Sequence, residues 1–209
     1  MFTRFLPLAG IIALIAVGIV WRSWIQYRRY GVSGIALFRA TNWRQRIRDS
    51  LFFALFAGTL AQAIVFAIAP AVLTPLTVVP AAWTAPLALV GGPLVVVGLA
   101  ITVAAQLGMG ASWRIGIDET ARPGLVTSGL YRFCRNPIYL GMLTMVTGLT
   151  ALEPTALSLV LGLTIYWCIR TQTLEEEIYL ERTYGLEFVA YAGRVGRFVP
   201  GLGRLVKFS

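Results

Sequence analysis

The stretch that decides the fold is IYLGMLTMVTGLTALEPTALSLVLGLTIYWCI, residues 138–169. It holds two apolar runs, Ile138–Leu152 and Thr155–Ile169, which are separated by Glu153 and Pro154. A charged residue followed by proline is typical of a turn, so the stretch predicts a hairpin of two apolar helices. Each run has about 15 residues, whereas a membrane span needs about 17 or more. We therefore expect that the polar flanks extend the helices, or that the hairpin is thin or tilted.

Apolar segments dominate the rest of the chain as well. Of its 209 residues, 57% are hydrophobic and 13% are charged, and the mean hydropathy is +0.75. A soluble domain of this length does not need so much apolar surface, because most of its exterior faces water. Three further apolar runs precede the hairpin, at Phe5–Trp24, Leu51–Ala69 and Leu87–Leu107. We expect an all-α polytopic membrane protein with about five transmembrane helices.

The distribution of charge predicts the orientation in the membrane. Arginines gather in the segments Arg22–Asp49 and Met109–Arg135, whereas the loop Pro70–Pro86 has neither lysine nor arginine. Basic loops tend to stay in the cytoplasm. The pattern predicts an N-terminus outside and a C-terminus in the cytoplasm, and we expect the inner membrane of a bacterium. The net charge of +9 follows from the same rule, so it does not indicate nucleic-acid binding.

The residue types that are missing restrict the chemistry. The sequence has no histidine, which is the commonest general base and the commonest metal ligand in proteins. Its two cysteines, Cys134 and Cys168, are too few for a thiolate metal site and form no disulfide framework. We expect no bound metal.

Polar groups flank both ends of the hairpin on its expected cytoplasmic side. The segment Arg135–Pro137 precedes the first helix, and Glu175–Glu177 follows the second apolar run. The hairpin brings these ends together, so we expect one pocket containing donors, carboxylates and aromatic rings. Carboxylates at the membrane end of a helix are costly unless they are paired or functional. A purely structural ion cluster, with Arg132, Arg135 and Arg170, is the alternative.

The chain divides into a membrane scaffold, residues 1–108, and a region carrying the polar site, residues 109–209. Within the second region, apolar residues recur at near-helical spacing from Gln172 to Tyr191. This spacing, with its high charge density, predicts a helix that leaves the membrane and lies on its surface.

Three motifs in order make the C-terminal half recognisable. They are Leu125-Val126-Thr127-Ser128-Gly129-x-Tyr131, then Arg135-Asn136-Pro137-x-Tyr139-x-Gly141, then Glu176-Glu177-x-x-Leu180-x-x-x-Tyr184-Gly185-x-Glu187-Phe188-x-x-Tyr191. Together they resemble the isoprenylcysteine carboxyl methyltransferase family, within the wider family of membrane phospholipid and isoprenylcysteine methyltransferases. The resemblance covers about residues 110 to 200, and the first three apolar runs carry no comparable signature.

The resemblance implies S-adenosylmethionine in a cytoplasmic pocket and a lipid-like or prenylated substrate that enters from the bilayer. The family usually has histidine at Asn136 and arginine at Gln172. We expect Gln172 and the nearby Arg170 to be the catalytic residues that orient the acceptor. The cofactor contacts that the resemblance implies are Pro123, Gly124, Leu125, Val126, Tyr131, Asn136, Pro137, Ile138, Tyr139 and Glu176.

The residues favour displacement of a methyl group by a nucleophilic oxygen. A carboxylate is already deprotonated, so it needs no general base, and alignment in a dry pocket can supply most of the acceleration. Three other functions stay open at this point. They are a phospholipid N-methyltransferase, an NADPH-dependent protein similar to sterol reductases, and a membrane scaffold without catalysis.

Overall fold

The protein is helical throughout the part that the computed structural model describes, residues 2–31, 34–35, 43–113 and 124–205. These residues contain no strand. The α-helices are α1 (Leu6–Ala13), α2 (Arg22–Tyr30), α3 (Trp43–Ile68), α4 (Ala81–Gly108), α5 (Pro137–Leu152), α6 (Ala156–Tyr184) and α7 (Leu186–Arg194). A π-helical segment, Leu14–Trp21, joins α1 to α2 in one continuous helix. The predicted all-α membrane fold is confirmed.

Three of the described helices are long and apolar enough to cross a membrane. They are Thr3–Tyr30, Gln45–Ile68 and Ala81–Gly108, which correspond to the three apolar runs that precede the hairpin. Helix α4 begins before Pro86, so this proline lies inside the helix and not in the loop. Helix α5 has only 16 residues, and the five-span arrangement stays a prediction for the hairpin.

The second helix of the hairpin is longer than its apolar run. Helix α6 has 29 residues, because it continues without a break through the polar residues from Arg170 to Tyr184. The separate surface helix expected over Gln172–Tyr191 is therefore wrong in its bounds. Helix α6 ends at Tyr184, before Gly185, whose positive φ of 53° favours glycine, and α7 begins at Leu186.

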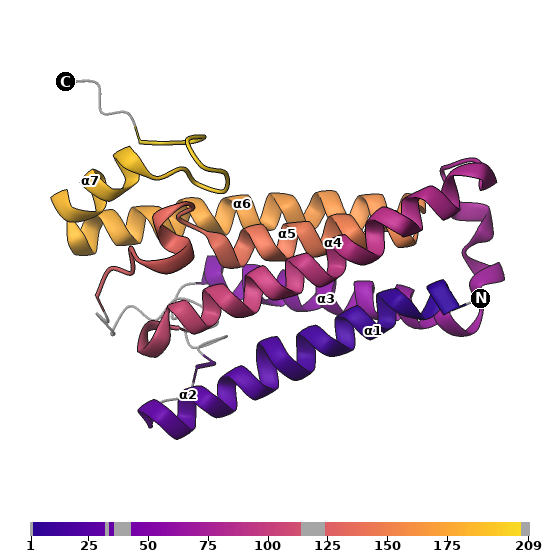
Figure 1. Ribbon diagram of the computed structural model, residues 1–209, viewed down its shortest axis with the longest axis horizontal. Coiled ribbons are helices and arrows are strands. Elements are labelled where there is room, and N and C mark those ends of the chain that lie inside the picture. Colours follow the sequence, from indigo (N-terminus) through magenta and orange to yellow (C-terminus); the bar gives the residue numbers. More distant parts are fainter. Residues whose placement is uncertain (1, 32–33, 36–42, 114–123, 206–209) are drawn as a thin grey trace.

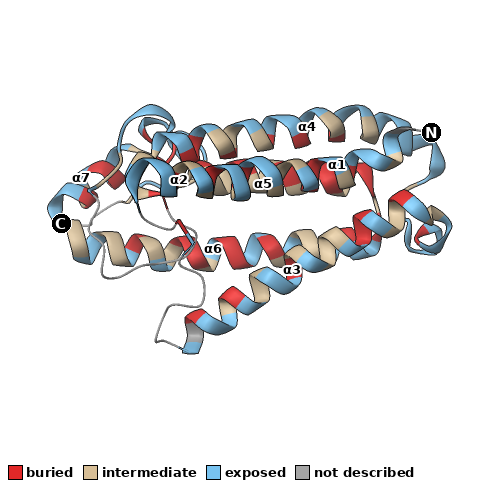
Figure 2. Cartoon of the chain, turned by 90° about the horizontal axis from the view of Figure 1, so that it is seen from below, coloured by how far each residue is buried: buried red, intermediate tan, exposed pale blue. Residues whose placement is uncertain are grey.

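Helices α4, α5 and α6 run side by side along the long axis of the molecule (Figure 1). Helix α3 packs against α6 and α1. Helix α1 begins near one end of the molecule, and α7 lies at the other end (Figure 1). Many residues on the outer faces of the helices are exposed (Figure 2), and they include large apolar side chains such as Leu89 and Leu163. Such side chains suit hydrocarbon better than water.

Glycines allow α4 and α5 to approach closely. A Cβ atom at Gly98 would lie 2.5 Å from the Met145 nitrogen, and one at Gly148 would lie 2.7 Å from the Gly91 oxygen. Small residues at helix contacts let backbones meet in this way. The adjacent Gly92 differs, because a Cβ atom there would lie 3.7 Å from the Leu6 side chain, which is an ordinary van der Waals distance.

The two adjacent glycines therefore predict opposite effects of substitution. We expect Gly91→Ala to destabilise the protein by about 1–3 kcal/mol, because its Cβ would lie 2.7 Å from the Gly148 oxygen. We expect Gly92→Ala to be neutral or slightly stabilising, since alanine favours helix more than glycine does. Thermal unfolding of both variants in detergent tests this prediction, and equal melting temperatures would contradict it.

Candidate functional site

The start of α5 is held by the segment that follows α7. The backbone nitrogen of Arg135 donates to the Gly196 oxygen at 2.9 Å, and that of Asn136 donates to the Arg197 oxygen at 3.1 Å. Pro137 occupies the first turn of α5, where its missing N–H costs nothing. The C-terminal segment thus fixes the Arg135–Pro137 motif at the end of the molecule where α7 lies.

Glu177 is the centre of a buried ion cluster. Its Oε1 accepts from Arg135 at 2.8 Å, and its Oε2 accepts from Arg197 at 2.8 Å. Arg135 also donates to the carbonyl oxygens of Ala192 and Val195. Of the three arginines in the ion cluster considered from the sequence, Arg135 pairs with Glu177, and Arg197 supplies the second cation. No described ion pair joins Arg132 or Arg170 to these glutamates.

The neighbouring carboxylate, Glu176, has different partners. Its Oε1 accepts from the Tyr139 hydroxyl at 2.6 Å and from Gln172 Nε2 at 3.0 Å. Glu176 lies beyond the apolar run of α6, and burial raises the pKa of its carboxyl, while the hydrogen bonds from Tyr139 and Gln172 lower it. Three of the predicted site residues thus meet at this carboxylate.

Tyr131 lies close to this group. Its side chain is buried, and its hydroxyl donates to the Ala105 oxygen of α4 at 3.4 Å. Burial raises the pKa of the Tyr131 phenol, and the nearby Glu176 carboxylate raises it further. Tyr131 is therefore a neutral donor at physiological pH. Its own backbone oxygen accepts from the Tyr191 hydroxyl at 2.6 Å, which ties the 3₁₀ turn Gly129–Arg132 to α7.

Asn136 and Arg170 differ in their relation to the site. The Asn136 Nδ2 atom donates to the Arg197 oxygen at 3.2 Å and lies 3.5 Å from Glu177 Oε1. The Asn136 amide therefore contacts the ion cluster around Glu177. Arg170 is exposed, and the structure does not bring it to Glu176 by any described ion pair or hydrogen bond.

The other predicted cofactor contacts lie in the chain just before Tyr131 and at the start of α5. Leu125 packs against Phe188 and Tyr191, and Pro137 is buried at the start of α5. Val126 and Ile138 are half-buried, and Gly124 is exposed with a φ of 90°. Pro123 lies outside the described residues.

Sequence reasoning missed one residue at this end of the molecule. Arg48 of α3 forms an ion pair with Glu175. The sequence shows Arg48 as one of several arginines in the basic segment Arg22–Asp49, where the whole set indicates membrane orientation. The sequence carries no signal that separates it from the other arginines.

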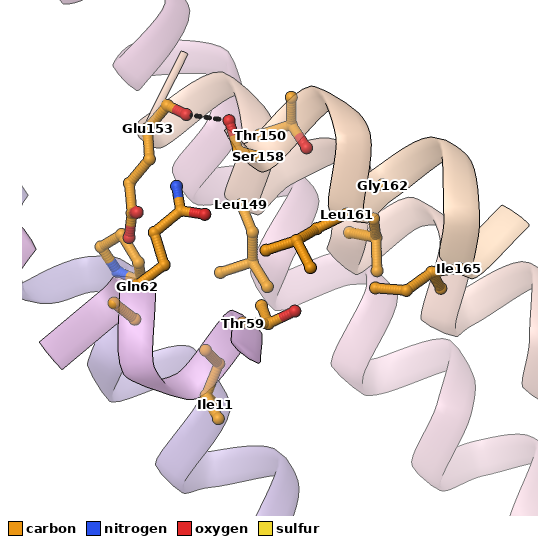
Figure 3. A pocket seen from close by; sticks show the side chains of 13 residues that line it. Ile11, Thr59, Gln62, Leu149, Thr150, Glu153, Ser158, Leu161, Gly162 and Ile165 are labelled. Carbon is orange, nitrogen blue, oxygen red and sulfur yellow. Dashed lines mark hydrogen bonds between the residues drawn. The ribbon is translucent and has the colours of Figure 1, made fainter. Parts of the chain in front are cut away.

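A cavity lies at the opposite end of the hairpin, near the α5–α6 turn (Figure 3). Its lining is mostly apolar, but Glu153 and Gln62 point toward each other there and Ser158 donates to the Glu153 backbone oxygen. Glu153 is 3% exposed, and burial raises the pKa of its carboxyl to about 7. This cavity is separate from the group around Glu176.

The raised pKa of Glu153 predicts a pH-dependent stability. Folding favours the protonated form, so the contribution of Glu153 is full below its ordinary pKa of 4.5 and is lost as the pH rises through about 7. We expect Glu153→Gln to raise the free energy of unfolding by about 1–3 kcal/mol at pH 8 and to have little effect at pH 4.5. Melting temperatures at both pH values test this. The exposed Glu181→Gln serves as the control, and an equal gain at both pH values would contradict the assignment.

Comparisons with known proteins agree on a methyltransferase relationship. The profile of the phospholipid methyltransferase family matches residues 87–187. Protein-S-isoprenylcysteine O-methyltransferase A of Arabidopsis thaliana is 32% identical over 110 residues, which cover 51% of this chain and 56% of that protein. Protein-S-isoprenylcysteine O-methyltransferase of Mus musculus is 31% identical over 110 residues, which cover 51% of this chain and 39% of that protein.

The matched part begins within α4 and includes the Tyr131, Tyr139 and Glu176 group. The 110 residues aligned with the two relatives cover 56% of the Arabidopsis thaliana protein and 39% of the Mus musculus protein, so the chain spans about half or less of their length. Helices α1, α2 and α3 lie outside the family profile, but the third apolar run, Leu87–Leu107, lies inside it. The expectation that the first three apolar runs carry no comparable signature is therefore wrong for the third run.

Proposed function

Because this chain belongs to the isoprenylcysteine carboxyl methyltransferase family, we propose that it transfers a methyl group from S-adenosylmethionine to a lipid-like carboxylate. The substrate would be an isoprenoid acid or a prenylcysteine. The observation that carries the proposal is the Glu176 carboxylate, held by Tyr139 and Gln172 at the start of α5. The proposal includes a scaffold over residues 1–108, a site region over residues 109–209 and a cytoplasmic C-terminus, in a bacterial inner membrane.

The donor and acceptor groups at this site suit S-adenosylmethionine. Both described hydrogen bonds to Glu176 use Oε1, so among the described residues Oε2 is left to accept from an ammonium group or a ribose hydroxyl. The N–H groups of Ile138 and Tyr139 lie in the first turn of α5, where helices leave donors unpaired and suit an anionic group. The rings of Tyr131 and Tyr139 suit a sulfonium or an adenine.

Further contacts of the cofactor would come from both sides of these groups. We assign this role to Gly124, Leu125, Val126, Asn136 and Pro137, and to Pro123, which lies outside the described residues. Asn136 keeps one donor and one acceptor but cannot titrate, so it can bind but cannot transfer a proton.

The chemistry requires little of the protein beyond binding and alignment. When bound, S-adenosylmethionine would supply a methyl group to a carboxylate oxygen of the acceptor. The C–O bond would form as the S–C bond breaks, and the electron pair of the S–C bond would stay on sulfur. No proton moves, which agrees with a chain that has no histidine. Gln172 would orient the acceptor next to Glu176, Arg170 would assist from the same helix, and the apolar helices would exclude water.

Isothermal titration of the purified protein in detergent tests this function. We expect binding of S-adenosylmethionine and none of NADPH, which separates a methyltransferase from a sterol-reductase-like protein. Folded protein that fails to bind S-adenosylmethionine would refute the proposal and leave the scaffold role. Transfer of a radiolabelled methyl group to native membrane extract would then identify the acceptor, and label on a phospholipid amine would favour N-methylation.

A further inference from the structure

Two of the three consecutive glutamates, Glu175 and Glu177, pair with arginines from other parts of the fold. Arg135 and Arg197 both serve Glu177, and Arg135 is saturated by further bonds to backbone carbonyl oxygens. Both arginines therefore belong to the structural cluster around Glu177, and Arg135 uses all three of its guanidinium nitrogens within the protein.

Arg48 of α3 has fewer described hydrogen-bond and ion-pair partners than Arg135. Its Nη1 pairs with Glu175, but the Glu175 side chain is 48% exposed, whereas that of Arg48 is 15% exposed. The Nε atom of Arg48 is buried and has no hydrogen-bond partner among the described residues. A buried donor without a partner is unfavourable, and a ligand oxygen that accepts from it removes this cost. The guanidinium thus keeps a directed donor and part of its charge for an anion.

Arg48 also lies beside the group that we assign to the cofactor. Its charge lowers the pKa of the Glu176 carboxyl. Leu51 and Phe52, on the next turn of α3, pack in the same apolar cluster as Tyr139. Arg48 therefore approaches the Tyr139–Glu176 pair from α3, in the half of the chain that the family profile does not cover.

The other candidates for an anion partner at this end are weaker. Gln172 has no charge, and its Nε2 atom donates to Glu176. Arg170 is exposed on α6, whereas a carboxylate with an apolar tail should be bound where water is excluded. Among the described residues at this end of the molecule, Arg48 is the cation that combines a largely buried side chain, an unpartnered donor and a charge that acts on Glu176.

We propose that Arg48 binds the carboxylate of the methyl acceptor and makes the site specific for an acid over a neutral analogue. The proposal rests on the proposed methyltransferase function. A guanidinium presents paired N–H groups in the planar geometry that a carboxylate matches, so Arg48 would hold the acceptor oxygen while its ion pair with Glu175 limits the motion of the side chain. Arg48 then determines which acceptor is used and takes no part in holding S-adenosylmethionine.

The test compares two probes, N-acetyl-S-farnesylcysteine and its carboxamide, on the full chain in detergent. With wild-type protein we expect methylation of the acid and binding of the carboxamide at least about tenfold weaker than that of the acid. In Arg48→Gln, we expect the KM for the acid to rise about 10–100-fold and the preference over the carboxamide to disappear. The Kd of S-adenosylmethionine should stay within about twofold of the wild-type value. The exposed Arg182→Gln on α6 is the matched control and should leave all values unchanged.

Each failure has its own signature. If Arg48→Gln keeps the preference for the acid, or loses S-adenosylmethionine binding while folded, the assignment of Arg48 is overturned and the methyltransferase function stands. A wild-type protein that does not distinguish the two probes overturns carboxylate recognition. If the wild type does not bind S-adenosylmethionine at all, the proposed function itself fails. Arg48→Met removes the charge and keeps an apolar stem, so it serves if Arg48→Gln does not fold, and a full preference for the acid in this variant would also overturn the proposal.

Discussion

Glu176→Gln is expected to weaken the binding of S-adenosylmethionine at least about 100-fold while the protein remains folded. The glutamine oxygen can still accept from Tyr139 and Gln172, so the local hydrogen bonds survive the substitution. What is lost is the negative charge opposite a cationic ligand, and loss of one partner of a buried charged pair costs about 2–5 kcal/mol. Isothermal titration at pH 8, where the wild-type carboxyl is more fully ionised, measures the effect.

The matched control for this experiment is Glu181→Gln. Glu181 lies on the same helix but is exposed, so its substitution should change the affinity less than about twofold. Because burial raises the pKa of Glu176, the wild-type affinity should also fall as the pH decreases toward and below that pKa, whereas the affinity of Glu176→Gln should not follow this profile. Wild-type affinity in folded Glu176→Gln would show that the cofactor lies elsewhere.

Glu177→Ala is expected to lower the stability of the fold. The substitution leaves the buried guanidinium groups of Arg135 and Arg197 without their shared carboxylate. Removing one partner of a buried ion pair costs about 3–5 kcal/mol. For a protein of this size that corresponds to a fall in melting temperature of about 6–20 °C. We expect the segment after α7 to detach from the start of α5 and become sensitive to protease.

The exposed Glu187→Gln on α7 is the control for Glu177→Ala and should leave the melting temperature nearly unchanged. A melting temperature of Glu177→Ala equal to that of this control would contradict the structural role. The two adjacent glutamates thus predict separable defects, which are lost binding with an intact fold for Glu176 and a weakened fold for Glu177.

The different roles of these neighbours could not be predicted from the sequence. Consecutive residues on a helix point about 100° apart, so a run of three glutamates presents its side chains to different neighbours. The sequence pattern predicts that carboxylates and aromatic rings meet across the hairpin, and the Tyr139 hydroxyl donates to Glu176. It does not tell which carboxylate meets Tyr139 and which meets Arg135, because Arg197 and Gly196 approach from a segment 20 residues further along the chain.

By itself, the sequence determined that this protein is an all-α membrane protein and which family it resembles. Apolar composition and the spacing of motifs are local properties, so they can be read along the chain. Only the tertiary structure decided that α6 continues through its polar flank, that Gly91 and Gly98 meet α5, and that Arg48 of α3 reaches the glutamates of α6. These features depend on how distant helices pack, and no neighbouring residue in the sequence carries that information.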